Sequence, residues 1–326
     1  SLPSPVIKTG KCADVRKYIS LTMNNFLYII KSGPFLGIFI FWVVQTIGNS
    51  FYIGMRYETS VYLVTNIVAG FLYENMIVFA IAIVTIYSGE VVWRERDKKF
   101  DGFFNALPVS TNVIFAAKLS SILLLIYFLM ASNIVFGVLI QLFNGYYNFE
   151  PGLYFKYFMI FGPVFLVLIA LLSFVIHIIV NNKYLGYMLV LLYYISHMFM
   201  SGLDLSHPLY NYAAVDFTYS DLNGFGYIGR FVVLSIYWLI FIIILLLGAK
   251  FFWVRGNETG FVQRLKIFRS DLDRKTIATF TALGLCFACV GSYIFYNENI
   301  LNKYETNSDQ EKNSVQYEKD YKRFER

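Results

Sequence analysis

Residues 88–110, SGEVVWRERDKKFDGFFNALPVS, lie between two long apolar stretches and decide how the chain is organised. Most residues from 90 to 101 are charged, whereas charged residues make up only 15% of the whole chain. Charge at this density is excluded from the hydrocarbon core of a bilayer. The second half places apolar residues on one helical face: Phe100, Phe103, Phe104 and Leu107. We therefore predict a charged amphipathic helix that lies at a membrane surface and transmits force from a partner in the aqueous phase.

The composition is that of an all-α polytopic membrane protein. The 326 residues are 57% hydrophobic and 19% aromatic, and the charged fraction is well below the roughly 25% typical of soluble domains. The net charge of +6 follows the expected membrane topology and does not indicate nucleic-acid binding. We expect the lipid bilayer to be the principal surroundings of the chain.

Seven stretches reach the roughly 20 residues that a helix needs to cross a bilayer. They are 34–54, 64–87, 112–142, 154–180, 184–200, 231–250 and 276–296. Lysine and arginine are biased to one side of these spans, with 18 on the side of the N-terminus and 3 on the other side before the C-terminal tail. Because positive charge favours the cytoplasm, we predict a cytoplasmic N-terminus and an extracytoplasmic C-terminus.

The predicted organisation has five parts. Residues 1–33 form a cytoplasmic interfacial, elbow-like helix, and residues 34–255 form a six-span domain with the charged region 88–110 and an external segment at 201–229. A cytoplasmic basic linker (256–275), a seventh span (276–296) and an extracytoplasmic helical stalk (297–326) follow.

This pattern resembles the membrane half of ABC-2 type (type V exporter-like) ATP-binding-cassette exporters. YSGEVVWRERDKKFDGFFNALPVS is similar to the coupling-helix region of that family. FFWVRGNETGFVQRL and YSDLNGFG resemble bacterial ABC-2 permeases fused to a C-terminal M1 aminopeptidase-like domain. The chain begins at Ser1 without an initiator methionine and ends in a charged run. We expect it to be the second permease half, plus the junction, of a longer polypeptide.

The resemblance implies an exporter of the bacterial inner membrane. It implies a separate ATPase subunit, which holds ATP and Mg, and a second permease half from the same polypeptide or a homodimer. Zinc is implied only for a peptidase-like domain beyond this chain. The residues implied to couple to the ATPase are Glu90, Trp93, Arg94, Glu95, Arg96, Phe100, Phe103, Phe104 and Leu107.

Two alternative functions remain open. In one, the spans serve chiefly as a membrane anchor that positions the external peptidase-like domain; in the other, the chain is an ion-coupled secondary transporter that uses Glu74. Glu74 lies about 21 Å along the second span from Ser88, at 1.5 Å per residue. Carboxylates at such depth tend to face a bundle interior or a wet cavity. We therefore expect Glu74 to face the interior and, with Asn75, to line a possible pathway.

Other motifs carry no chemistry of their own. Thr281, Gly284, Ala288 and Gly291 place small residues on one face of the seventh span, suited either to packing within the chain or to docking of another permease half. Residues 224–229 match GxGxxG but neither follow a buried strand nor open a βαβ unit, so a turn is the better interpretation. HExxH and GxxxxGK[ST] are absent, and His177, His197 and His207 have no zinc-site spacing. We predict no catalytic and no metal-binding residue in this chain.

Overall fold

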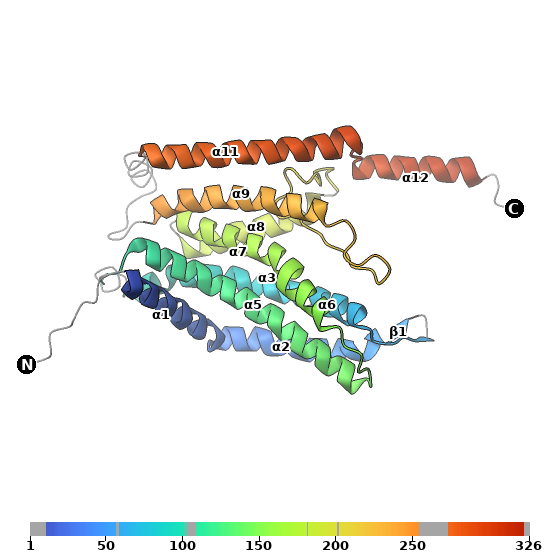
Figure 1. Ribbon diagram of the computed structural model, residues 1–326, viewed down its shortest axis with the longest axis horizontal. Coiled ribbons are helices and arrows are strands. Elements are labelled where there is room, and N and C mark those ends of the chain that lie inside the picture. Colours follow the sequence, from blue (N-terminus) through green and yellow to red (C-terminus); the bar gives the residue numbers. More distant parts are fainter. Residues whose placement is uncertain are drawn as a thin grey trace, which may run out of the picture.

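A computed structural model describes residues 11–56, 59–100, 102, 109–180, 182–200, 202–253 and 273–322. It is a bundle of long helices that run side by side along one axis (Figure 1). The elements are α1 (Lys11–Ile30), α2 (Gly33–Ile53), β1 (Met55–Arg56), β2 (Thr59–Ser60), α3 (Thr65–Asp97), α5 (Thr111–Phe143), α6 (Pro151–Phe155), the π-helix η1 (Lys156–Phe161), α7 (Gly162–Ile179), α8 (Lys183–Met200), α9 (Gly229–Phe252), α11 (Arg274–Phe295), the π-helix η2 (Tyr296–Leu301) and α12 (Asn307–Tyr321).

Three helices, α3, α5 and α7, form the centre of the bundle and contact one another. The α7 sequence GPVFLVLIALLSFVIHII is apolar on every side, and most of its residues are buried, as expected for a helix surrounded by others. Helices α1 and α2 cover one side, α8 and α9 cover another, and α11 lies outermost against α9 (Figure 1). Helix α12 extends beyond the bundle (Figure 1).

The chain is a multi-pass, predominantly helical protein. Among the described residues, six helical segments are long and apolar enough to cross a membrane: 33–53, 65–97, 111–143, 151–179, 229–252 and 274–301. They match six of the seven predicted spans. The predicted span 184–200 is the helix α8, which lies in the bundle but is not among the six. Its four tyrosines, with Lys183, Ser196 and His197, add polar groups to an otherwise apolar helix.

Helix α3 extends well past the end of the predicted span 64–87. It continues unbroken to Asp97, because residues 91–93 pack into the core and Glu95 is buried as well. The first half of the predicted coupling region is therefore the end of a spanning helix. Its second half, residues 101 and 103–108, lies outside the described residues.

The predicted external segment 201–229 closes the opposite end of the bundle. Described from residue 202, it has no regular helix before α9, and Gly224 and Gly226 adopt positive φ angles of 58° and 60° in a turn. The turn interpretation of the GxGxxG match is confirmed. The segment dips inward, because the buried Tyr212 donates a hydrogen bond of 2.8 Å to the Leu168 carbonyl of α7.

A histidine joins three helices near the charged end. His177 of α7 is buried between Gly89 of α3 and Gly186 of α8, and the Tyr187 ring lies edge-on at 4.7 Å. A Cβ atom at Gly89 would lie 2.7 Å from His177 Nε2, and one at Gly186 would lie 2.6 Å from His177 Cε1. Neither glycine has space for a side chain.

We predict that Gly89→Ala and Gly186→Ala each lower the free energy of unfolding by about 1–3 kcal/mol, as overpacking does. Unfolding in detergent measures the loss. The matched control is Gly284→Ala on α11, where a Cβ atom would meet no other atom within 4 Å, and this change should cause no loss. The double variant His177→Ala with Gly186→Ala should lose less free energy of unfolding than the sum of the two single changes. If the two losses simply add, His177 and Gly186 do not restrict each other.

Candidate functional site

The end of α3 carries a buried charge cluster. Lys118, on α5, is 2% exposed and donates hydrogen bonds to Glu95 Oε2 and to the Val91 carbonyl, both on α3. The other Glu95 oxygen accepts from Arg94 at 3.0 Å. Arg94 also donates to Asn25 Oδ1 of α1 at 2.6 Å. This network, the Lys118 cluster, joins α1, α3 and α5 by charge-assisted bonds, which are stronger than neutral ones.

A second ionic contact joins α3 to α8. The Lys183 ammonium binds Glu90 Oε2 at 2.9 Å and also binds Asp97. Partial burial alone would lower the pKa of Lys183, but its hydrogen bonds to Asp97 and Glu90 outweigh burial and raise the pKa above its ordinary value. Lys183 therefore stays charged at neutral pH and fixes the start of α8 beside the end of α3.

Aromatic rings line the same end of the bundle. Arg94 and Lys98 both lie over the Tyr28 ring of α1, at 5.0 Å and 4.7 Å from its centroid. Arg96 lies 5.0 Å from the Trp93 ring, and Lys118 lies 5.3 Å from the Trp253 ring at the end of α9. These cation–π contacts extend the network from α1 to α9.

The predicted coupling residues divide into two groups. Trp93 and Glu95 are buried, and Glu90, Arg94 and Arg96 are half-buried. Glu90, Arg94 and Glu95 bind residues of other helices, whereas Arg96 lies over Trp93 of the same helix. Residues 97–100 are exposed. Phe103, Phe104 and Leu107 lie outside the described residues. Among the described residues of the region 88–110, residues 97–100, Gly102 and Ser110 are exposed.

Four residues of the site were not recognised as its members from the sequence: Asn25, Tyr28, Lys118 and Lys183. Of these, only Lys118 could have been recognised from the sequence. It is a charged residue inside a long apolar stretch, and such residues need a polar partner. Its partner on another helix is not readable from spacing.

The expectation that Glu74 faces the bundle interior is wrong, because the side chain is exposed on α3. The interior positions of α3 around it are apolar, including Leu72 and Met76. Asn75 is partly buried and accepts a hydrogen bond of 2.7 Å from Asn49 of α2. Glu74 therefore lies on the exposed face of α3, and Asn75 lies where α3 meets α2.

The small residues of α11 have different surroundings. Gly291 contacts α9, where a Cβ atom would lie 3.2 Å from the Tyr237 ring. Thr281, Gly284 and Ala288 are exposed. Packing within the chain therefore accounts for Gly291 and leaves the other three on an open helix face.

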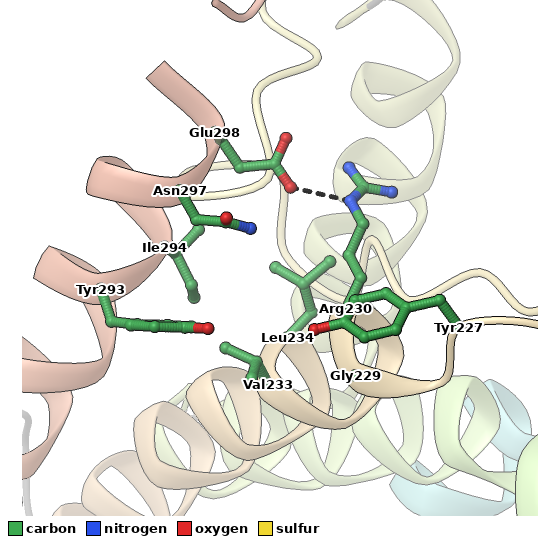
Figure 2. Close-up of a pocket in the computed structure, with 9 residues that line it drawn as sticks. All are labelled: Tyr227, Gly229, Arg230, Val233, Leu234, Tyr293, Ile294, Asn297 and Glu298. Carbon is green, nitrogen blue, oxygen red and sulfur yellow. Dashed lines mark hydrogen bonds and ion pairs between the residues drawn. The ribbon is translucent and has the colours of Figure 1, made fainter. Parts of the chain in front are cut away.

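A small pocket lies between the start of α9 and the end of α11 (Figure 2). Arg230 Nε donates to Glu298 Oε1 at 2.7 Å across its rim, and Val233, Leu234 and Ile294 form its apolar side (Figure 2). Its volume of about 20 Å³ is close to that of one water molecule. It is too small for a transported molecule.

No protein-family model, curated protein or solved structure matches this chain. The arrangement of helices identifies a multi-pass helical membrane protein with a charge cluster at one end of its central helix.

We predict that Lys118→Met lowers the free energy of unfolding by about 3–5 kcal/mol, because it removes the main partner of the buried Glu95 carboxylate. Lys312→Met is the matched control, since the Lys312 side chain, paired with Asp309, is 77% exposed and exposed pairs contribute about 0–1 kcal/mol. Adding Glu95→Gln to Lys118→Met should restore part of the loss. Equal losses for the two single variants, measured by denaturant titration in micelles, would contradict the assignment.

Proposed function

We propose that this chain is the permease half of an ABC-2 type exporter, coupled to a separate ATPase subunit that binds the region 88–110. The main support for the proposal is that α3 is one unbroken helix from Thr65 to Asp97. One helix of 33 residues, about 50 Å long, joins the exposed residues 97–100 to the centre of the bundle. A displacement of its charged end moves the helix as a rigid rod.

The ionic contacts bind the end of α3 to particular neighbouring helices. The Lys118 cluster links the end of α3 to α1 and α5, and Lys183 links it to α8. A push from an ATPase on residues 97–100 is then shared by four helices. ATP and Mg belong to the partner subunit, and the export pathway forms between this half and a second permease half. The exposed face of α3 that carries Glu74, with the Asn49–Asn75 pair at its border with α2, is a polar surface suited to face that half.

A second candidate function is a membrane anchor for an extracytoplasmic domain. It is favoured by the contacts of the C-terminal segment with residues 202–211. His207 Nε2 is 2.7 Å from Asn299 Oδ1, and Asp204 accepts a 3.0 Å bond from the Ser308 N–H at the start of α12. Hydrogen bonds from Ser308 lower the pKa of Asp204. The start of the stalk is therefore held in one orientation, as an anchor requires.

We predict that Lys99→Glu combined with Phe100→Ala reduces co-purification of the ATPase subunit at least tenfold, because both side chains are exposed at the end of α3. The melting temperature should stay within about 2 °C, since surface changes have small effects. Arg16→Glu, a charge reversal exposed on α1, is the matched control. Undiminished ATPase binding by the double variant would overturn the coupling role.

Topology provides an independent test. With α8 counted as a crossing, five helices (α5, α7, α8, α9 and α11) separate Gly102 from the tail. A reporter that is active only in the cytoplasm should therefore be active when inserted at Gly102 and inactive when fused after Arg326, since positive charge holds the α3 end in the cytoplasm. Similar activity at the two positions would place the tail and the α3 end on the same side. That result would exclude the extracytoplasmic anchor but not the coupling site.

A further inference from the structure

A hollow of about 490 Å³ opens at the end of the bundle opposite the Lys118 cluster. This volume lies within the roughly 300–1,000 Å³ of small-molecule sites. One wall is the start of α6 and η1, and the other is the turn that precedes α9. The hollow is lined by Glu150, Gly152, Leu153, Lys156, Tyr219, Gly224, Phe225 and Ile228.

Two opposite charges border the hollow without pairing. Glu150 and Lys156 are exposed, and neither side chain makes an ion pair or hydrogen bond with the described part of the chain. Glu150 is the N-cap residue of α6, and Lys156 is the first residue of η1, so the two charges lie at opposite ends of α6. The Glu150 N–H donates to Thr65 Oγ1 at 3.2 Å, which fixes the backbone that carries the carboxylate. The site therefore presents a separated carboxylate and ammonium.

The opposite wall is held in place before any ligand arrives. Phe225 stacks on Phe161 with ring centroids 4.4 Å apart, and Tyr219 packs edge-on against Phe225 at 5.0 Å. The Ser220 N–H donates to the Gly224 carbonyl at 2.8 Å and closes the turn. Binding to such a wall does not require ordering of a loop, which is a major cost of recognition.

We propose that this hollow binds a small zwitterion with an apolar part, with its ammonium group on Glu150, its anionic group on Lys156 and its apolar part against Phe225 and Ile228. A molecule with one charge leaves either Glu150 or Lys156 unmatched. A free amino acid or peptide and the headgroup of a zwitterionic phospholipid share the required chemistry. The site is separate from the proposed coupling function, which it neither requires nor supports.

The first test uses the full chain in nanodiscs of phosphatidylglycerol and calorimetry with L-phenylalanine, its amide and its N-acetyl derivative. The zwitterion should bind at least tenfold more tightly than either blocked form. Glu150→Gln should remove the preference for a free amine, and Lys156→Met should remove the preference for a free carboxylate. Glu311→Gln and Lys319→Met, which change the same charges on the exposed face of α12, should leave both preferences intact.

The second test identifies a lipid source. If the headgroup of phosphatidylethanolamine is the occupant, this lipid should co-purify with the wild type and fall at least tenfold in Glu150→Gln and Lys156→Met. Its presence in the nanodisc should then weaken phenylalanine binding. Retention of the lipid unchanged by either variant, together with equal binding of the three soluble probes, would overturn the proposal.

Discussion

The buried ion pair between Lys118 and Glu95 constrains the rest of the bundle. An ammonium group on an apolar helix is unstable in a membrane unless a polar group meets it. Lys118 obtains that partner only because α3 continues as a helix well past Ser88. The same pairing sets the register of α3 against α5, and Arg94, held by Glu95, then fixes α1 through Asn25. Breaking the pair would remove charged contacts that join three helices, while the apolar packing between them remains.

The helices of the bundle differ in how many of their residues are buried and in which side chains they expose. Helix α2 buries only Phe35, Trp42 and Thr46, whereas α7 is mostly buried. Large apolar side chains on the exposed faces suit lipid or another membrane helix, because neither environment penalises them. Glu74 does not suit lipid, since a charged group at the bilayer centre costs about 2.5–3.5 kcal/mol on insertion scales. Its exposure is the strongest physical reason to expect a protein neighbour on the exposed face of α3.

The two ends of the bundle are built differently, and the difference agrees with their proposed roles. The α3 end is held by ion pairs to α5 and α8 and by a hydrogen bond from Arg94 to Asn25 of α1. The opposite end is held by aromatic stacking around Phe161 and Phe225 and by the inward-facing Tyr212. Aromatic packing tolerates small changes in ring position, whereas ion pairs at hydrogen-bond distance do not.

The sequence by itself determined the class of protein and most of its helices, because a run of about 20 apolar residues in a bilayer has few alternatives to a helix. It also located the charged end of α3, since charge density is a local property. Tertiary structure decided the rest. The pairing of Glu95 depends on Lys118 of another helix, the exposure of Glu74 depends on which face of α3 meets its neighbours, and the surroundings of His177 depend on two glycines of other helices. These contacts join residues far apart in the chain, and hydrophobic runs carry no information about such pairs.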